Sequence, residues 1–260
     1  MRRLVGVILV AGLVACAPAQ TEPANLEQIP TAQIAAQRGE ISFEELAPGI
    51  WMHTSYKRVE SWGDVVSHGM IVERGDHAVL IDSAWNDAQT TDILDWAEQD
   101  LGQPITLAVF THAHSDKMGG VDAIRLRGGI RTLAHPLSNA NAPWHGVSPA
   151  EEDLPLGDIG ASTILDGLEI FYPGGGHTQD NIVVYDPENR LLFGGCLIRP
   201  GPSDNLGNTN DADLGYWAQA IANVDSRFPD ATIVLPSHGD PAGRDLLNHT
   251  QLLATDIMED

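Results

Sequence analysis

The sequence contains few cysteines, few basic residues and a single long apolar run. Its 260 residues include only two cysteines, Cys16 and Cys196, so it is not a small domain held together by disulfides. Fourteen lysines and arginines face 36 aspartates and glutamates, which gives a net charge of −22. Such a charge repels phosphate backbones and anionic lipids. We therefore expect no nucleic-acid partner.

The apolar run follows two arginines and extends over residues 4–15. It is too short to cross a bilayer as a helix of the mature protein, and its basic start is typical of a signal peptide. Its last letters, LVAC, resemble the bacterial lipobox and predict lipidation of Cys16. An ordinary signal cleaved after Ala17 or Ala19 is the alternative. Residues 1–16 are thus expected to direct the chain to the periplasm, with a lipid anchor in the bacterial outer membrane.

Two further segments follow the predicted signal peptide. Residues 17–40 are rich in alanine, proline, glutamine and threonine, which predicts a flexible tether. Residues 41–260 are long enough for one domain with a sizeable core and show neither a second linker nor an internal repeat. Loss of residues 1–16 removes two arginines and no acid, which changes the net charge from −22 to −24. We expect a soluble, monomeric domain that meets a membrane only through its N-terminal lipid.

Apolar and β-branched runs bounded by turn residues predict strands, and 3.6-residue periodicity predicts helices. The predicted strands are Gly49–Thr54, Val65–Val72, Ala78–Ile81, Ile105–Phe110, Ile130–Leu133, Leu168–Tyr172, Ile182–Tyr185, Leu191–Phe193 and Thr232–Leu235. The predicted helices are Asp87–Asp100, Met118–Arg127, Asp213–Arg227 and Arg244–Ile257. Early strands followed by alternating strands and helices favour an α/β fold with two sheets covered outside by helices. Residues 140–165 show no clear pattern.

Four of the predicted strands run directly into a residue that can bind a metal. These residues are His112, His177, Cys196 and His238. A rigid sheet aims the residues of the loops at its edge, so a shared site is expected there. Glycines surround three of them, which lets the backbone pack close to an ion.

The first of these loops carries three potential ligands at alternate positions, His112, His114 and Asp116. With His177, Cys196 and His238 they make two three-ligand sets, one of imidazoles and one of a carboxylate, a thiolate and an imidazole. Each set leaves a coordination position open, as catalytic zinc sites do. Taken singly, each residue has an ordinary alternative, a turn histidine or a buried small cysteine. The other histidines, for which we expect surface or capped-core roles, are His53, His68, His77, His135, His145 and His249.

The order of these residues resembles the cysteine-containing, dizinc subclass B1 of the metallo-β-lactamases. The likeness runs from about residue 50 to residue 250, through THAHSDKMGG at 111–120, GHTQDN at 176–181, GGCLI at 194–198 and LGN at 206–208. Within the subclass the sequence looks most like the New Delhi-type enzymes, which are also lipid-anchored. The resemblance implies a four-layer αββα sandwich. It also implies two zinc ions, zinc one on His112, His114 and His177, and zinc two on Asp116, Cys196 and His238.

Lys117 separates this sequence from other hydrolases of the same fold. Glyoxalase II, lactonases and many relatives have a second histidine directly after the aspartate, and a bridging aspartate where this chain has Cys196. The resemblance therefore implies hydrolysis of the β-lactam amide of penicillins, cephalosporins and carbapenems, which confers antibiotic resistance. A dizinc hydrolase of another ester, thioester or lactone is the alternative on the same fold. A zinc-storing or cell-envelope binding lipoprotein is the alternative from a different class.

The resemblance also assigns roles around the metals. Asp116 would orient the nucleophile, and Asn208 would lie near the lactam carbonyl, unless it only forms a turn. Arg199 stands where the family usually has a lysine that binds the substrate carboxylate; a surface charge is its alternative. Trp62 and Val65 would lie on a hairpin flap, unless Trp62 packs in the core. The remaining expected contacts are Trp85 as a pocket wall and Asp82 as a residue that orients the ligands.

Overall fold

The computed structural model describes residues 34–257, so the predicted signal peptide and Cys16 lie outside the described part. The first sheet has the strand order β1-β2-β3-β4-β5-β6-β7-β8. Its strands are β1 (Ile34–Arg38), β2 (Ile41–Ala47), β3 (Ile50–Val59), β4 (Gly63–Glu73), β5 (Ala78–Ile81), β6 (Ile105–Phe110), β7 (Arg131–Ala134) and β8 (Glu152–Asp153).

The second sheet has the order β13-β12-β11-β10-β9. Its strands are β9 (Ser162–Leu165), β10 (Leu168–Phe171), β11 (Val183–Asp186), β12 (Leu191–Gly195) and β13 (Ile233–Pro236). The helices are α1 (Asp87–Gln99), α2 (Ser115–Met118), α3 (Val121–Arg127), α4 (Pro136–Asn141), the 3-10 helix η1 (Ala142–His145), α5 (Leu214–Arg227) and α6 (Asp245–Asp256). None of the described helices combines the length and apolar character needed to cross a bilayer.

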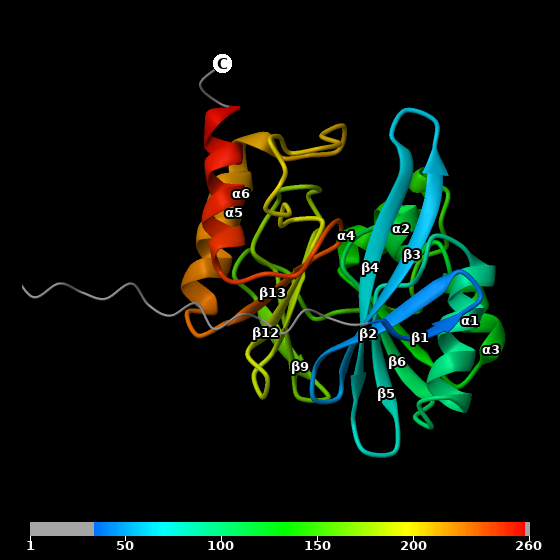
Figure 1. The fold of residues 1–260 in the computed structure, drawn as a ribbon. Coiled ribbons are helices and arrows are strands. Elements are labelled where there is room, and N and C mark those ends of the chain that lie inside the picture. The colour runs from blue at the N-terminus through cyan, green and yellow to red at the C-terminus, as the bar shows by residue number, and fades with distance from the viewer. Residues whose placement is uncertain (1–33, 258–260) are drawn as a thin grey trace, which may run out of the picture.

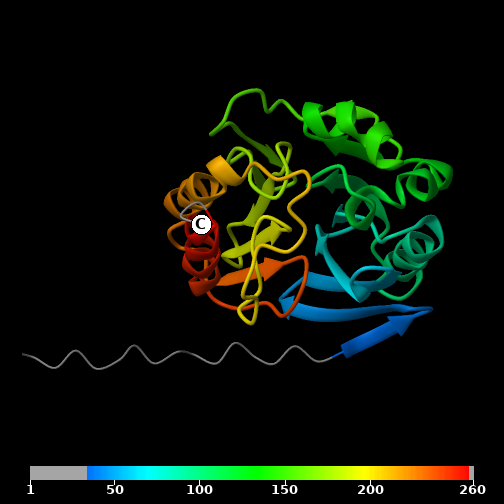
Figure 2. The same ribbon diagram turned by 90° about the horizontal axis from the view of Figure 1, so that it is seen from above.

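The elements form four layers, helix, sheet, sheet and helix. In Figures 1 and 2, α1 and α3 cover the outer face of the first sheet, and α5 and α6 cover the outer face of the second. The αββα sandwich that the sequence predicts is therefore confirmed.

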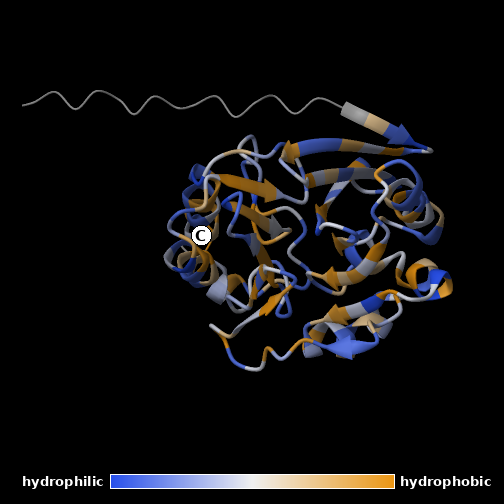
Figure 3. Cartoon of the chain, turned by 90° about the horizontal axis from the view of Figure 1, so that it is seen from below, coloured by the Kyte–Doolittle hydropathy of each residue, from blue (hydrophilic) through white to orange (hydrophobic). Residues whose placement is uncertain are grey.

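Three clusters of buried apolar side chains hold these elements together. Strand β6 contributes to two of them, which explains its continuously apolar sequence. Ala108 and Phe110 pack in the cluster shared with α1 and α3, whereas Leu107 and Val109 pack in the cluster between the sheets. A strand buried on both faces needs apolar residues at every position. Trp217 of α5 anchors a third cluster outside the second sheet. Figure 3 shows hydrophobic residues along the strands of both sheets.

Two details differ from the predicted elements. The predicted helix Met118–Arg127 is interrupted at Gly119 and Gly120, which separate α2 from α3. A Cβ at Gly120 would collide with the Thr90 side chain of α1, so close packing requires glycine there. In addition, residues Ile34–Arg38, inside the range predicted as a tether, form strand β1, which pairs with β2. The short elements from α4 to β9 occupy the region where the sequence has no clear pattern.

Strand direction gathers the functional loops at one edge of the sandwich. Strands β5, β6 and β7 are parallel, and β12 and β13 are parallel in the second sheet. The carboxyl ends of parallel strands meet at one edge, which brings the loops after β6, β12 and β13 together. Figure 1 shows the β3–β4 hairpin and the loop between β12 and α5 at this same edge.

Candidate metal centre and pocket

Three imidazoles meet in what we call the first ligand set, His112, His114 and His177. His114 Nδ1 lies 3.1 Å from His112 Nε2 and 3.2 Å from His177 Nε2. The first two residues follow β6, and His177 lies in the loop between β10 and β11. His112 and His177 are buried, and His114 is partly exposed. The structure thus brings His177 to two histidines that lie more than 60 residues earlier in the chain.

The second ligand set consists of Asp116, Cys196 and His238. Cys196 Sγ lies 3.6 Å from Asp116 Oδ2 and 3.3 Å from His238 Nε2, and the last two atoms are 3.7 Å apart. The two sets adjoin, because donor atoms of His112, His177 and Cys196 also lie within 4.8 Å of one another.

These separations fit zinc. Zinc–nitrogen bonds of about 2.0–2.1 Å in a tetrahedron place two nitrogens roughly 3.3 Å apart, and a sulfur ligand widens the spacing to about 3.5 Å. Two donors of the first set, His112 and His177, are also in the protonation state that a metal needs. Burial, followed by the charge of His114, holds the pKa of His112 well below its ordinary value, so its ring is neutral. Burial likewise lowers the pKa of His177. The first set therefore offers lone pairs to a cation.

In the second set, positive charge is needed to stabilise the anions. Burial would raise the pKa of Asp116, but the ammonium of Lys117, with the neighbouring histidines, holds it well below the ordinary value. Burial, followed by the charge of Asp116, raises the pKa of the Cys196 thiol far above its usual range. A buried thiolate beside a carboxylate is stable only with a cation next to it. The donor chemistry of this set therefore fits a divalent metal.

Lys117 is fully buried beneath the second set. Its Nζ donates to Ser67 Oγ at 2.8 Å and to the His68 carbonyl at 3.0 Å, and lies 3.3 Å from Asp116 Oδ2 and 3.7 Å from Asp82 Oδ2. Burial alone would lower the pKa of Lys117, but the attraction of its anionic neighbours, Asp116 first, raises it. The ammonium is thus a permanent counter-charge below the ligands.

Strand β4 fixes the second set from the other side. His238 Nδ1 donates to the Val66 carbonyl at 2.6 Å, which leaves Nε2 to face Cys196. The Ser67 hydroxyl lies 3.2 Å from the Asp116 carbonyl oxygen, and the His68 amide donates to the Ser237 carbonyl at 2.8 Å. These contacts fix the imidazole ring of His238 and the backbone of the loops that carry Asp116 and His238.

Asp82 orients the first loop, as the sequence predicts. Its carboxylate accepts from the Thr111 amide at 2.7 Å and from the Thr111 hydroxyl at 2.8 Å, directly before His112. Burial raises the pKa of Asp82 to about 7, although Lys117 opposes this shift. On the far side of the loop, Asp180 accepts from the Ala113 amide at 2.9 Å. Two buried carboxylates therefore shape the turn that presents the histidines.

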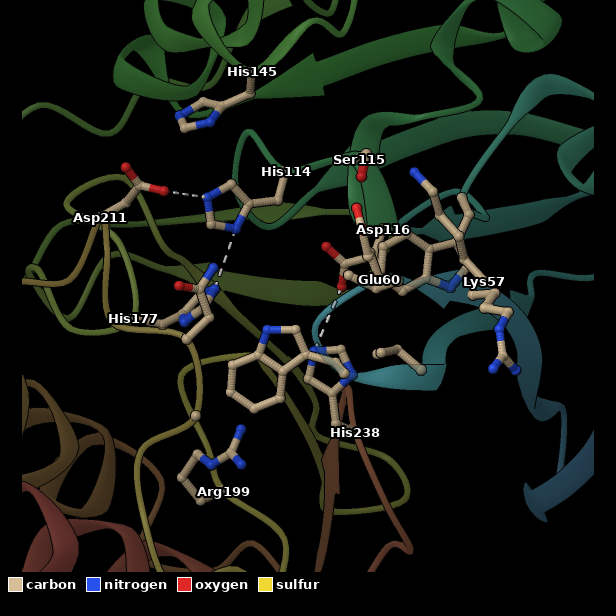
Figure 4. Close-up of a pocket in the computed structure, with 17 residues that line it drawn as sticks. Lys57, Glu60, His114, Ser115, Asp116, His145, His177, Arg199, Asp211 and His238 are labelled. Atoms are coloured by element: carbon tan, nitrogen blue, oxygen red, sulfur yellow. Dashed lines mark hydrogen bonds and ion pairs between the residues drawn. The ribbon is translucent and has the colours of Figure 1, made fainter.

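Four of the six proposed ligands, His114, Asp116, His177 and His238, line an open pocket of about 650 Å³ (Figure 4). Trp62 and Val65 of the β3–β4 hairpin line it, and Trp62 is 59% exposed, so the core-packing alternative for this tryptophan is wrong. Trp85 also lines the pocket, with Lys57 Nζ 5.4 Å from its ring centroid. Trp62, Val65 and Trp85 thus line the same pocket as the ligands, and their contacts with a substrate stay a prediction.

Arg199 and Asn208 line the same pocket. Arg199 Nε donates to the Asn205 carbonyl at 3.2 Å and Nη2 donates to Ser203 Oγ at 3.2 Å, so loop 203–205 positions the guanidinium. Asn208 Oδ1 accepts from the Asn210 amide at 3.2 Å. Asn208 therefore both forms a turn and lines the pocket.

Two pocket residues escaped the sequence interpretation. Asp211 Oδ2 lies 3.1 Å from His114 Nε2, the ring nitrogen that faces away from the first set. A carboxylate on the outer nitrogen fixes the ring and its tautomer. His145 also lines the pocket, contrary to the surface or core role expected for it. Neither residue lies in a periodic or glycine-rich run, so no signal in one sequence would have found them.

Four of the other histidines match the expectation. His53 and His68 are buried, His77 lies beside Asp76 at the surface, and His135 caps α4 by accepting from the Leu137 amide. None of these belongs to a group of metal-binding side chains within the described residues.

A sandwich with two adjoining ligand sets on the floor of an open pocket defines a metal-dependent hydrolase. A family model described as the Metallo-beta-lactamase superfamily matches residues 62–238. The chain belongs to this superfamily. The "Metallo-beta-lactamase type 2" of Bacillus cereus is 37% identical over 218 residues, which cover 82% of each chain.

Solved structures agree with this membership. A metallo-beta-lactamase from Hirschia baltica is 50% identical with a TM-score of 0.81, and covers 83% of this chain and 98% of that one. The metallo-beta-lactamase FIM-1 from Pseudomonas aeruginosa, in a mono-zinc form, is 51% identical with a TM-score of 0.81 and covers 85% and 98%.

Proposed function

We propose that this chain is a β-lactamase that hydrolyses the lactam amide with two zinc ions. The first ligand set would hold one ion and the second set the other. The observation that carries the proposal is the meeting of six donor atoms in two adjoining sets at separations suited to zinc. Relatives at 33–37% identity that bear the name metallo-beta-lactamase type 2 support the substrate class.

Zinc, when bound, supplies a Lewis acid and lowers the pKa of water toward neutrality. The chain's own side chains then determine how the substrate lies. Arg199 pairs with the substrate carboxylate, and Asn208 donates toward the lactam carbonyl oxygen from the facing loop. Asp116 accepts a hydrogen bond from the attacking water and so orients it. Trp62 and Val65 cover the apolar part of the substrate and exclude bulk water.

The proposed substrate range covers penicillins, cephalosporins and carbapenems, because all three combine the lactam amide with a nearby carboxylate. The closeness to New Delhi-type enzymes stays a prediction. The same holds for the monomeric state.

The proposed location is the periplasm, with Cys16 lipidated. Fractionation of cells that express the full chain tests this. We expect the wild-type chain in the membrane fraction and the Cys16→Ala chain in the soluble fraction. A wild-type chain found wholly in the soluble fraction would contradict the lipid anchor.

The activity is tested with a chromogenic cephalosporin, using zinc-loaded protein, chelator-treated protein and His112→Ala protein. We expect hydrolysis by the zinc-loaded wild type and by the surface control His77→Gln. The chelated and His112→Ala samples should lose at least about 100-fold, because the charge that stabilises the transition state is gone. Zinc per chain is measured on the same samples.

Lactone and thioester substrates distinguish the alternatives. Cleavage of these compounds without lactam hydrolysis at any zinc level would replace the proposal by the general hydrolase. Zinc binding without any turnover would favour a storage or binding lipoprotein.

A further inference from the structure

His145 is an imidazole in the pocket wall with no role in either ligand set. The short helix η1 carries it, and Gly146, with φ of +69°, turns the chain away directly afterwards. Its ring packs edge-on against His114, with ring centroids 4.8 Å apart and an interplanar angle of 77°. The pocket-lining position is therefore held by both the backbone and a ring contact.

The ring nitrogens of His145 make no hydrogen bond to any residue that the structure describes. Two other polar side chains of the pocket, by contrast, are engaged. Asp211 Oδ2 is bonded to His114 Nε2, and Arg199 is bonded to loop 203–205. His145 thus offers an unengaged N–H to whatever enters this side of the pocket.

Position and charge indicate which part of a substrate reaches His145. Figure 4 shows His145 and Arg199 at opposite ends of the pocket, with His114 and His177 between them. A lactam whose ring carboxylate pairs with Arg199 spans the ligands and directs its far end, the acyl side chain, toward His145.

The N–H of His145 calls for a hydrogen-bond acceptor at that end, and a carboxylate is the strongest acceptor that an acyl side chain can carry. Of the acidic residues that line the pocket, Asp116 belongs to the second ligand set, and Asp211 lies beside His145 with its Oδ2 bonded to His114, which leaves Glu60. Lys57 and Arg58 line the pocket on the hairpin side, and two bound metal ions would add further positive charge.

We propose that His145 determines specificity by binding a carboxylate on the acyl side chain of β-lactam substrates. The inference rests on the proposed β-lactamase function and extends it to a subsite at the end of the pocket opposite Arg199. A neutral or charged imidazole donates one hydrogen bond to the carboxylate, so the contact favours binding and leaves the chemical step unchanged.

Three penicillins that share one ring system test the proposal. Benzylpenicillin has an unsubstituted side-chain carbon, carbenicillin carries a carboxylate there, and ampicillin carries an amine. We expect His145→Phe, which keeps an aromatic ring but removes the N–H, to raise the KM for carbenicillin about fivefold, the value of one hydrogen bond. KM for the other two compounds and kcat for all three should stay unchanged. His145→Gln, which keeps an N–H donor, should restore part of the loss.

Trp144→Phe is the matched control, because Trp144 precedes His145 on η1 but is 88% exposed and does not line the pocket. Equal KM changes for all three penicillins, or none, would overturn the inference while leaving the β-lactamase function in place. Loss of a zinc ion from His145→Phe, measured by native mass spectrometry, would also overturn it by making His145 a metal ligand. Failure of the wild-type chain to hydrolyse any of the three would overturn the proposed function, and this inference with it.

Discussion

The two ligand sets lie side by side but are held in different ways. The first set consists of three imidazoles, and the outer nitrogen of His114 is oriented by Asp211, a residue at the pocket surface. The second set contains two acids and is held from behind by Lys117 and by strand β4, in the buried interior. A set without acids can be exposed to the pocket on one side, whereas buried acids need a counter-charge that solvent cannot supply.

The largest effect should come from removing that counter-charge. Lys117→Met leaves the carboxylates of Asp116 and Asp82 without their ammonium, which should lower the free energy of unfolding of the metal-free chain by about 3–5 kcal/mol. Urea denaturation of the metal-free protein measures this. The control is Lys57→Met, an exposed lysine whose loss should cost under about 1 kcal/mol. A similar small loss for both variants would show that the second set does not depend on its buried cation.

The second prediction concerns how Asp211 supports zinc binding at the first set. Asp211→Ala removes the acceptor on His114 Nε2 and should weaken zinc binding at the first set by about 10- to 100-fold. Competition with a chromophoric chelator measures the affinity. Asp204→Ala in the same loop, where the carboxylate contacts only Asn205 among the described residues, is the control. Unchanged affinity in Asp211→Ala would mean that packing alone orients the histidine.

The sequence predicts the ligands themselves, but it does not predict the two residues that support them, Lys117 and Asp211. The six proposed ligands could be predicted because each follows a strand whose apolar pattern is readable, and parallel strands bring their ends together. Lys117 stands next to Asp116 in the sequence, yet its burial depends on how β4 packs over α2. Asp211 lies in a loop and His145 in the short helix η1, and tertiary contacts set the course of both segments. Likewise β1, with the sequence IAAQR, carries no alternating pattern and forms by pairing with β2.

The third prediction concerns Arg199, which is proposed to bind the ring carboxylate of the substrate. Arg199→Ala removes a charged hydrogen-bond donor and should raise KM about tenfold for lactams that carry the ring carboxylate, with a smaller change in kcat. Steady-state kinetics measures both constants. Arg131→Ala, which loses only an exposed pair with Glu152, should change neither. If KM stays constant in Arg199→Ala, the carboxylate binds elsewhere.

The smallest effect concerns the buried histidines below the second set. Burial lowers the pKa of His53 to about 3, and that of His68 to about 3 as well. In the unfolded chain these rings titrate near their ordinary value of 6.5, so the stability that they contribute is present above that pH. It is lost as the pH falls from 6.5 toward 3.

His53→Asn should therefore reduce the loss of stability between pH 7 and pH 5, measured by denaturant unfolding of metal-free protein at each pH. His77→Gln alters a surface ring whose pKa is raised by Asp76, so its effect should have the opposite sign. An unchanged pH slope in His53→Asn would show that this ring does not titrate on unfolding.

Native mass spectrometry combined with an assay on the same samples tests the central claim most directly. At one free zinc concentration, the wild-type chain should carry two zinc ions and hydrolyse a chromogenic cephalosporin. Cys196→Ser should keep the ion of the first set, lose the other and lose most of the activity. Two zinc ions and full activity in Cys196→Ser, or no lactam hydrolysis by a wild-type chain that carries two, would contradict the account.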